Sequence, residues 1–584
     1  MRNVRDVETR LEAAENLLLR RADWRFLLPD PRPAHSVCFA GRALCRAVAA
    51  ISLATIDERS APPAGCDLAV VANPSDATLR RAWAALRPGG SLYAEQHLPL
   101  PGGTGALRRR LERRGFGDVA CYWPWPSPAA GPAQLWFPLG APGALRFFLG
   151  QRPAARGLLG RAGRTLRRTL WLLGLGLGVT PPICAVARKP AGDAELGCPT
   201  EDQGQATSAL RHRSSVVHPA REIDIGRTWQ AADPLRDAIR AEWAGWGLGE
   251  PPERLSWLVM TGGYRSTNKI VALAFAEPDP RPRLAVKMAR VPESVAALAH
   301  EAAMLRAVQA RRPGLAGVPR VLLERAHGDG VALVESAVVG LPLFTYLRRE
   351  NYADLAARAT DWLIALAGRP APIPRARWWR RLVAPVLDEF AGTFGAVADP
   401  ALLGRARELL ETLGDLPLAC EQRDFGPWNV LIADGGGLGV LDWESAELEG
   451  LPALDLIYFL AYLAFFFDGA IASGRYRESY RAALRVDSLT GRVQRECLAR
   501  YARAVGLKPG ALRPLRVLAW MLHARSEYRR MVADAGGPPS EVTLRAGLFL
   551  GLWEEELRLC DTAGEGLEGP SALPEIPWGD TQKL

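Results

Sequence analysis

The chain has 584 residues, a length that predicts two to four domains. Of these residues 48% are hydrophobic and 23% charged, a composition typical of globular proteins. Its formal net charge of +10 would suit an anionic partner. However, arginine is spread along the chain, and no recognition-helix motif or aromatic-lined basic groove accompanies it, so nucleic-acid binding is not expected. The nine cysteines include no C-x-x-C pair, and the first residues lack a signal-peptide core, which predicts reduced thiols and a cytoplasmic location.

The first 190 residues alternate between strand and helix patterns. Apolar runs at 37–40, 50–56, 67–71 and 91–95 predict strands, and residues 75–86 predict a helix before the last of them. Because strands that alternate with helices usually pair in parallel, we expect an α/β sheet here.

The second half of this region carries a more specific pattern. The helix is followed by Arg-Pro-Gly-Gly at 87–90, a strand, a second helix end at 111–116 and another strand at 119–123. This order resembles the back half of class I S-adenosylmethionine methyltransferases, which implies a Rossmann-like methyltransferase fold for residues 1–190.

The front half departs from those methyltransferases. A cofactor-binding turn needs closely spaced glycines, whereas residues 40–44 contain only Gly41. The interval from Gly41 to Asp67 is also short and lacks one strand and helix. We therefore favour a degenerate domain without methyltransferase activity. If S-adenosylmethionine does bind, Asp57 would contact its ribose, and otherwise Asp57 caps a strand.

An arginine-rich run and an apolar run follow one another within residues 152–179. This pattern fits a helix that covers the sheet, or a peripheral contact with an anionic membrane surface that would make the protein membrane-associated, and it is too short for a transmembrane span. Residues 191–222 are rich in Gly, Pro, Ser, Gln and charge, which predicts a flexible linker.

After the linker, two strands at 257–260 and 270–275 flank a turn that contains Gly262, Gly263 and Ser266. The backbone N–H groups of such a turn can cover phosphates. Lys287 then lies in an apolar strand and Glu301 on an amphipathic helix, the order of the ion pair that orients nucleotide phosphates in kinases.

The most informative motif is Asp424, followed by Asn429 and then by Asp442 beyond a short apolar hairpin. Gly426-Pro427 cannot continue a helix, so Asp424 to Asn429 is a loop, and the hairpin returns Asp442 beside Asn429. Phosphoryl transfer from a magnesium nucleotide needs a base near the acceptor and oxygen ligands for the metal. An ordinary acidic loop is the alternative interpretation.

Residues from about 223 to 566 resemble the aminoglycoside phosphotransferase and choline kinase family. The resemblance implies an α+β, protein-kinase-like bilobal fold, with an N-lobe at 223–340, a helical C-lobe at 341–566 and a tail at 567–584. The His-Gly pair that usually precedes the family's catalytic Asp is here Gln422-Arg423. By residue, the resemblance implies Asp424 as catalytic base, Asn429 and Asp442 as metal ligands, Lys287 with Glu301 as the phosphate-orienting pair, Glu335 and Val338 in the hinge that meets the adenine, and Asp455 as a support for the loop with the second metal ligand.

We therefore expect an ATP- and Mg²⁺-dependent phosphotransferase that acts on a hydroxyl of a small molecule, such as a sugar or a glycan precursor. Two alternatives stay open. One is an S-adenosylmethionine-dependent methyltransferase with a regulatory kinase-like half, and the other is a non-catalytic pseudokinase scaffold. The sequence specifies neither the acceptor nor the oligomeric state.

Overall fold

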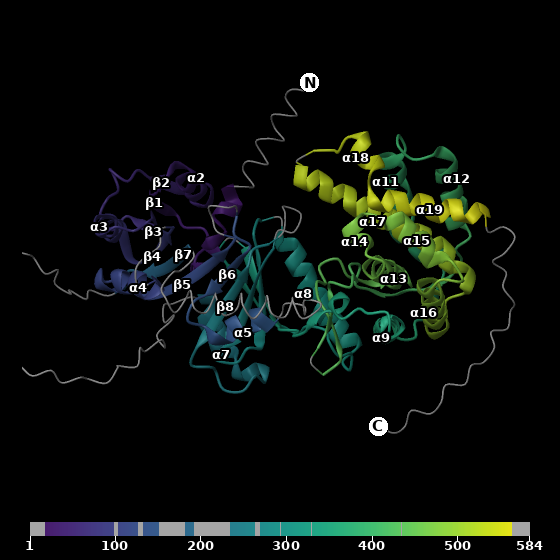
Figure 1. Cartoon of the computed structure of the whole chain (residues 1–584), viewed down its shortest axis with the longest axis horizontal. Helices are drawn as coiled ribbons and strands as arrows, with labels where there is room; N and C mark the ends of the chain where they lie inside the picture. The colour runs from purple at the N-terminus through teal and green to yellow at the C-terminus, as the bar shows by residue number, and fades with distance from the viewer. Residues whose placement is uncertain are drawn as a thin grey trace, which may run out of the picture. The chain divides into compact units, whose positions relative to one another are not determined.

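A computed structural model describes residues 18–97, 103–126, 132–150, 182–191, 234–262, 269–292, 294–328, 330–433, 435–535 and 537–562 (Figure 1). The residues expected to contact a membrane at 152–179, nearly all of the expected linker and the expected tail lie outside these ranges. The chain divides into two compact units. The first contains residues 1–309 and 317–341 with 433–435, and the second contains 310–316, 342–432 and 436–584. No helix among the described residues is long and apolar enough to cross a membrane.

The N-terminal part of the first unit contains the expected alternation of strands and helices. The elements are η1 (Asp23–Leu27), β1 (His35–Phe39), α2 (Arg42–Ile51), β2 (Ala54–Ile56), β3 (Cys66–Ala72), α3 (Asp76–Ala85), β4 (Leu86–Gln96), α4 (Gly103–Arg113), β5 (Gly117–Trp125), β6 (Leu135–Pro138), α5 (Pro142–Gly150) and β7 (Ile183–Arg188). Strands β2, β1, β3 and β4 pair in parallel in that order, and β7 lies antiparallel between β4 and β5. The expectation of a parallel α/β sheet is met for these four strands.

One predicted strand was partly wrong. The run 50–56 was expected to be a single strand, but α2 continues to Ile51 and only Ala54–Ile56 form β2. Helix α2 buries Leu44, Ala47, Val48 and Ile51 on one face, which gives an amphipathic helix rather than a strand. The helix predicted at 75–86 is confirmed as α3, and Ser75 caps it by accepting a hydrogen bond from the Thr78 N–H.

The remaining elements of the first unit extend the same sheet. They are α7 (Pro234–Glu242), η2 (Ala244–Trp246), β8 (Leu255–Met260), β9 (Lys269–Ala276), β10 (Pro282–Ala289), α8 (Ser294–Arg311), β11 (Val321–His327) and β12 (Gly330–Ser336). Strand β6 pairs antiparallel with β8, so one sheet runs in the order β11-β12-β10-β9-β8-β6-β5-β7-β4-β3-β1-β2. The expected N-terminal region and the expected kinase-like N-lobe therefore share a backbone hydrogen-bond ladder.

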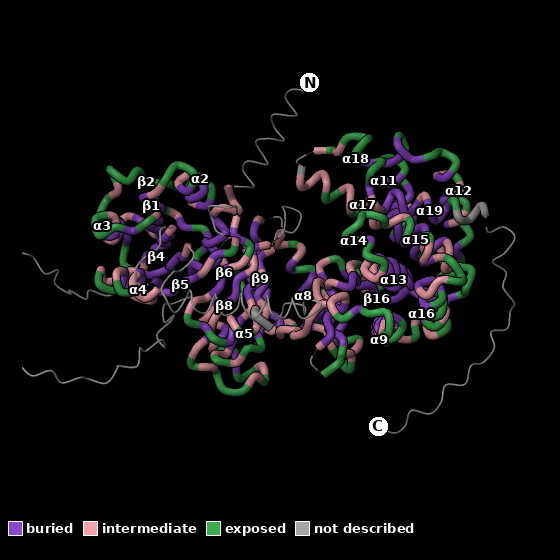
Figure 2. The backbone as a smooth tube through the Cα atoms, in the orientation of Figure 1, coloured by how far each residue is buried: buried purple, intermediate pink, exposed green. Residues whose placement is uncertain are grey.

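The two faces of this sheet bury different helices. Helices α3 and α4 pack on one face, against side chains such as Val71 and Leu92. The other face, which includes Val70 and Tyr93, is covered by η1, α2 and α7, and its core continues without a break to Val334 in β12. In Figure 2 the strand β4 is mostly buried, whereas the helices α2, α3 and α4 are more exposed. A continuous core of this kind makes the two regions one packing unit.

The second unit is mainly helical. It contains η3 (Leu343–Thr345), α9 (Tyr352–Ala367), β14 (Pro372–Ile373), α10 (Arg375–Leu382), α11 (Ala384–Phe394), α12 (Pro400–Glu411), β15 (Leu416–Pro417), β16 (Ala419–Glu421), β17 (Val430–Ile432), β18 (Leu438–Val440), β19 (Glu447–Gly450), α13 (Leu454–Phe467), α14 (Ala470–Ser473), α15 (Tyr476–Leu484), α16 (Leu489–Val505), η4 (Pro509–Ala511), α17 (Leu512–Ala535), α18 (Glu541–Arg545) and α19 (Leu548–Thr562). Strand β13 (Leu341–Pro342) lies at the division between the units. Helix α13 is apolar on every side and is buried almost throughout, which identifies it as the central helix of this unit (Figure 2).

Candidate active site

The loop that carries Asp424 begins directly after strand β16 and ends at strand β17. The Asn429 Nδ2 atom donates to Asp424 Oδ2 at 2.7 Å and to the Asp424 carbonyl at 3.0 Å. Asn429 is buried, whereas Asp424 is only half-buried. The structure therefore brings the predicted base and the first predicted metal ligand into direct contact, with the carboxylate still accessible.

Gly426 makes this loop compact. A Cβ atom at position 426 would lie 2.4 Å from the indole ring of Trp428, so no other residue fits without moving that ring. The Gly426 N–H donates to the Asp424 carbonyl at 2.7 Å, and the Gly426 carbonyl accepts from the Asn429 N–H at 2.9 Å. These bonds hold Asp424 and Asn429 at the two ends of a tight turn.

Gln422 connects this loop to the segment that contains Asp442. Its Nε2 atom donates to the carbonyl of Leu441 at 2.8 Å and to that of Asp442, while its Oε1 atom accepts from the Asp424 N–H at 2.8 Å. Gln422 is fully buried. A glutamine at the position where the family usually has histidine thus bridges the loop of the predicted base and the loop of the second predicted ligand.

The hairpin register brings Asp442 to the same end as Asn429. Strands β17 and β18 pair with Val430 opposite Val440, and the Leu441 N–H donates to the Asn429 carbonyl at 2.9 Å. Asp442 has a φ of 60°, a left-handed conformation that aspartate tolerates better than most residues. The hairpin predicted from the sequence is confirmed, including its two strands.

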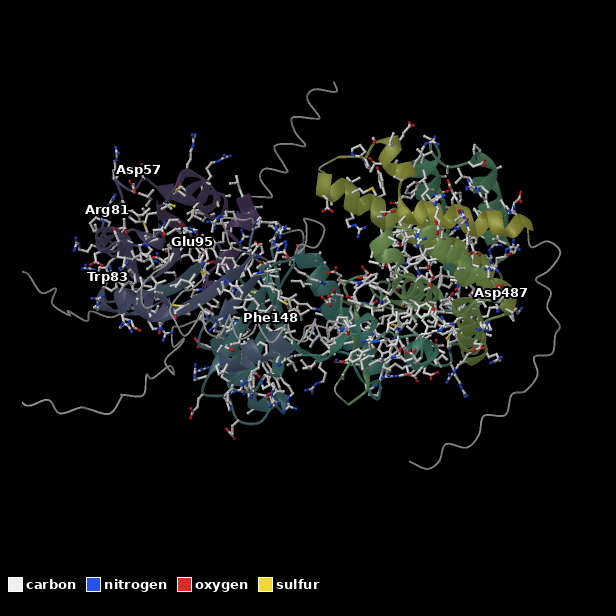
Figure 3. The ribbon with its side chains drawn as sticks, viewed as in Figure 1. Asp57, Arg81, Trp83, Glu95, Phe148 and Asp487 are labelled. Carbon is white, nitrogen blue, oxygen red and sulfur yellow. The ribbon has the colours of Figure 1, made fainter. Side chains whose placement is uncertain are left out.

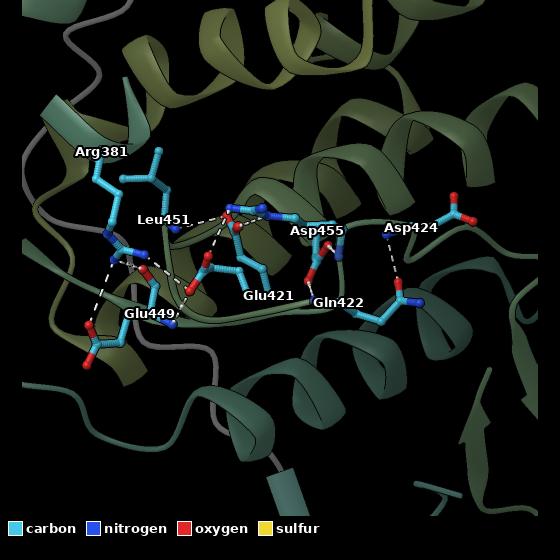
Figure 4. A network of polar contacts seen from close by, with 9 residues as sticks. Arg381, Glu421, Gln422, Asp424, Glu449, Leu451 and Asp455 are labelled. Carbon is cyan, nitrogen blue, oxygen red and sulfur yellow. Dashed lines mark hydrogen bonds and ion pairs between the residues drawn. The ribbon is translucent and has the colours of Figure 1, made fainter. Parts of the chain in front are cut away.

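Two buried carboxylates, Asp455 and Glu421, lie at the start of this loop (Figure 4). Asp455, in the first turn of α13, accepts the N–H groups of Gln422 at 2.6 Å and of Arg423 at 2.8 Å. Burial raises the pKa of Asp455 to about 6, although these two hydrogen bonds act to lower it. Glu421 accepts the Leu451 N–H at 2.9 Å, and burial raises its pKa to about 7. The resemblance implied that Asp455 supports the loop with the second metal ligand, but its carboxylate instead binds backbone N–H groups at the start of the Asp424 loop. Nothing in the sequence pointed to Glu421.

Arg423 occupies a backbone conformation that suits glycine. Its φ is 68°, which explains why a glycine fits at this position of the family's motif. Here the guanidinium compensates in part, because its Nε atom donates to Glu421 at 2.9 Å and its Nη2 atom lies 3.9 Å from Glu447. Arg423 is thus held in this left-handed conformation by contacts with Glu421 and Glu447.

Aromatic side chains of this loop and of helix α13 pack together. Trp428 packs edge-on against Tyr462 at 4.8 Å between ring centroids, and Tyr458 stacks on His523 at 3.8 Å. Burial and then the neighbouring Tyr462 and Asp424 charges raise the pKa of Tyr458, while burial lowers the pKa of His523 to about 3. These side chains are therefore uncharged at neutral pH.

Lys287 lies in the first unit, on β10. Its Nζ atom lies 2.5 Å from Glu301 Oε1 on α8 and 3.1 Å from Glu335 Oε2 on β12. All three side chains are at least 94% buried, and Lys269 Nζ lies 4.0 Å from Glu301 Oε2. The predicted pair of Lys287 and Glu301 is thus formed, while the contacts of Glu335 and Lys269 with it were not foreseen.

The other residues predicted to contact the nucleotide also belong to the first unit. Gly262 follows β8, and its carbonyl accepts from Arg290 at 3.4 Å. Gly263 and Ser266 lie outside the described residues. Val338 follows β12 and is half-buried, whereas the Glu335 backbone lies inside β12 between β10 and β11.

The oxygen donors present in the second unit fit Mg²⁺. The Asn429 amide uses its nitrogen on Asp424, which leaves its oxygen as the group for a cation, and Asp442 offers a carboxylate. Among the described residues, no group of three or more His, Cys, Asp or Glu side chains is arranged to hold a metal. Magnesium bound together with a nucleotide needs only one or two protein oxygens, since phosphates and water fill the other positions.

One family model and several solved structures are similar to parts of this chain. Residues 272–499 match the model of the phosphotransferase enzyme family, APH, which confirms the resemblance for that segment. Among solved structures, a thermostable mutant of aminoglycoside phosphotransferase APH(4)-Ia in complex with AMP-PNP and hygromycin B has 15% identity and a TM-score of 0.35, over 53% of this chain and 95% of that one. APH(3'')-Id from Streptomyces rimosus has 16% identity and a TM-score of 0.30 over 50% and 97%, and ADP-bound APH(2'')-Ib has 12% and 0.31 over 55% and 99%. No curated protein matches the chain. The family match begins at residue 272, so the methyltransferase-like interpretation of the N-terminal region stays a prediction.

Proposed function

We propose that this protein transfers a phosphoryl group from ATP to a hydroxyl of a small molecule, with Asp424 as the catalytic base. The observation that carries the proposal is the contact between Asp424 and Asn429 on a loop that Gln422 and Asp455 hold in place. A carboxylate that is fixed in this way and still half accessible can accept or orient an acceptor proton.

Each remaining polar group has a part in this proposal. Asn429 and Asp442 would hold Mg²⁺, which when bound neutralises charge on the transferring phosphate. Lys287, oriented by Glu301, would bind phosphate oxygens of the nucleotide. Gln422 positions Asp424 and the Asp442 backbone without contacting either substrate.

The aromatic side chains near Asp424 favour a sugar or a glycan precursor as acceptor. Trp428 and Tyr462 are half-buried, uncharged rings near the loop, and both pack against the buried Tyr458. Sugar rings have apolar C–H faces that pack on aromatic rings and hydroxyls that can reach a nearby carboxylate. These rings support a sugar as the acceptor within this proposal.

The decisive experiment replaces Asp424 by asparagine in the full chain and measures ADP release with a library of hydroxyl metabolites. We expect turnover to fall by about 10²- to 10⁴-fold, the usual contribution of a general base, while ATP affinity stays largely unchanged. Asp487→Asn is the matched control, because Asp487 is an exposed aspartate of the second unit (Figure 3). Turnover of Asp424→Asn at the rate of the control would remove the role that we assign to Asp424.

For the N-terminal region we infer a methyltransferase-like sheet that has no methyl-transfer activity. In open α/β sheets, ligands bind beyond the carboxyl ends of the parallel strands. At that end of β4, the buried Glu95 already binds both Nη atoms of Arg21 at 2.6–2.7 Å, and Trp24 stacks on Tyr93 at 4.0 Å. These contacts at the carboxyl end of β4 support our inference that no cofactor binds there.

Calorimetric titration of the full chain with S-adenosylmethionine tests this inference. We expect no heat of binding, because a cofactor would have to displace the buried Arg21–Glu95 pair. Saturable binding that an Asp57→Ala variant weakens would instead favour the alternative of a methyltransferase with a regulatory kinase-like half.

A further inference from the structure

A cavity of about 230 Å³ lies in the first unit, away from Lys287 and its carboxylates. It is bounded by the N-terminal segment around η1, by the end of α2, by the end of β10 and by the hairpin of β11 and β12. Its lining combines apolar side chains with four that carry or can acquire positive charge. The apolar side chains include Phe26 and Met288, and the four basic ones are Arg25, Arg32, Arg290 and His327.

Arg290 is the central group of this cavity. Its side chain is only 3% exposed, and its Nη2 atom donates to the Thr261 carbonyl at 2.7 Å and lies 3.3 Å from Asp23 Oδ2. Its Nε and Nη1 atoms are buried and have no hydrogen-bond partner among the residues that the structure describes. A buried guanidinium with two unused donors is costly unless an acceptor reaches it.

One carboxylate among the described residues, Asp23, lies beside Arg290. Arg25 is also buried and donates to the Arg290 carbonyl at 2.8 Å, and Arg20 adds a further positive charge near the same carboxylate, Asp23. Asp23 also lies near Arg20 and Arg25, and apart from the 3.3 Å ion pair with Arg290 its oxygens make no hydrogen bond within the described residues. The guanidinium of Arg290 therefore has one carboxylate beside it among these residues, and two buried donors without an acceptor at the cavity that it lines.

We propose that this cavity binds a small soluble organic anion, with a phosphate or carboxylate on Arg290 and a short apolar body against Phe26 and Met288. A guanidinium presents donors in a planar fork that matches both anionic groups. The volume corresponds to roughly seven or eight water molecules at liquid density, which fits a small metabolite and excludes a nucleotide or a peptide.

The position of Arg290 connects this site to the nucleotide-binding residues. Arg290 follows Lys287 by three positions and precedes α8, which carries Glu301. Its Nη2 atom also holds the carbonyls of Thr261 and Gly262, immediately before the loop 263–268 that is predicted to cover phosphates. An anion on Arg290 should therefore change ATP affinity, typically by 5- to 150-fold for coupled sites. This coupling rests on the proposed function, whereas anion binding itself does not.

Binding is tested with the full chain in the absence of ATP, using butyl phosphate as the probe and inorganic phosphate, butanol and butylamine for comparison. We expect butyl phosphate to give saturable binding by calorimetry and a rise in melting temperature, inorganic phosphate to bind more weakly, and the neutral and cationic analogues to have no effect. Equal effects of butanol and butyl phosphate would contradict an anion site.

Variants of the lining residues identify the anion site. Loss of one charge-assisted hydrogen bond should weaken butyl phosphate binding by roughly tenfold or more, so we expect this in Arg290→Gln and in the charge-neutral double variant Asp23→Asn/Arg290→Gln, which serves if the single variant does not fold. Ala50→Phe, at the exposed rim, should block entry. Arg46→Gln, exposed on the same helix α2 and outside the lining, should bind as the wild type does. Wild-type affinity in both Arg290 variants, or loss of binding in Arg46→Gln, would overturn the proposal.

A lipid headgroup has the same anionic chemistry, so vesicles of phosphatidylcholine with and without phosphatidic acid form a last arm. We expect no cosedimentation that depends on Arg290. If the chain sediments with phosphatidic acid through Arg290 and does not bind butyl phosphate, the soluble ligand that we propose is wrong. Failure of the Asp424 experiment would leave all of these binding results untouched.

Discussion

Two buried carboxylates show how differently the two units use the same chemical group. Glu95, in the N-terminal sheet, is surrounded by side-chain donors: Arg21 binds it twice, the Tyr93 hydroxyl donates at 2.8 Å and His97 lies 3.0 Å away. Asp455, in the second unit, accepts hydrogen bonds from the backbone N–H groups of Gln422 and Arg423, at the start of the loop of Asp424. The hydrogen bonds of Glu95 join side chains to one another. Those of Asp455 instead fix the loop of Asp424, which is only half-buried.

The pKa values express this contrast. Burial acts to raise the pKa of Glu95, but hydrogen bonds from His97, Arg21 and Tyr93 outweigh burial and lower it to about 2. The pKa of Asp455 is raised to about 6, because two backbone dipoles do not replace the lost water. A carboxylate that is fully compensated by side chains serves stability, and one that is incompletely compensated marks a place where the fold accepts a cost for function.

The largest effect should follow from breaking the side-chain cluster around Glu95. Glu95→Ala leaves Arg21 without its partner in a largely buried position, which typically costs about 3 kcal/mol of unfolding free energy. Chemical denaturation followed by near-UV circular dichroism measures the change. Glu58→Ala is the control, because the Glu58–Arg81 pair is 3.9 Å long and exposed and should contribute less than about 1 kcal/mol. Equal losses in the two variants would show that Glu95 has no special structural role.

The pH dependence of stability should have opposite signs in the two regions. The folded-state pKa of Glu95 lies below its unfolded value of 4.5, so its ionised form stabilises the fold above pH 4.5 and this stability, about 3 kcal/mol, is lost as the pH falls toward 2. Glu421 beside Asp455 has a folded-state pKa of about 7, above its unfolded value, so its protonated form favours folding and this advantage is lost as the pH rises from 4.5 through 7.

Denaturation of the wild type, Glu95→Gln and Glu421→Gln between pH 3 and pH 8 separates these contributions. The difference between the wild type and Glu95→Gln should shrink toward pH 3. The difference between the wild type and Glu421→Gln should shift against the wild type from pH 5 to pH 8. Parallel pH profiles for the two variants would contradict the contrast.

Variants of Gln422 test whether the loop of Asp424 must be connected to the segment of Asp442. Gln422→Ala removes the acceptor of the Asp424 N–H and the donor to the Leu441 and Asp442 carbonyls, so buried backbone groups lose their partners. We expect kcat to fall by roughly 10- to 100-fold and the Mg²⁺ concentration for half-maximal activity to rise, because both loops lose their alignment. Gln422→His, which restores the family's usual residue, should retain activity. A collapse of Gln422→His together with normal Gln422→Ala would refute the bridging role.

The sequence predicted local features far better than contacts across the sheet. The loop of Asp424 and Asn429, the hairpin after it and the pair of Lys287 and Glu301 were predicted, because short-range patterns and one recognisable order of motifs specify them. The joining of β6 to β8 was not, since pairing between distant strands leaves no local signal.

Contacts between side chains were the other feature that could not be predicted from the sequence. Glu335 was interpreted through its backbone, yet its carboxylate contacts Lys287, because a strand's alternation decides which face a side chain takes and the register was unknown. Glu421 and Arg290 gave no signal for a similar reason. Their importance comes from burial and from neighbours that are far away in the chain.

The smallest effect concerns the backbone conformation of Arg423, in the loop that Asp455 binds. Arg423→Gly and Arg423→Ala both remove the ion pair with Glu421, so they differ only in the cost of a φ of 68°. Because a Cβ atom disfavours this conformation, Arg423→Gly should be more stable than Arg423→Ala by about 1 kcal/mol in denaturation experiments. At Arg407, exposed within helix α12, the order should reverse, since glycine costs about 1 kcal/mol relative to alanine inside a helix. If alanine were the better replacement at both positions, the loop would not be held in the left-handed conformation, and the alignment of Asp424 by Asp455 and Gln422 would need another explanation.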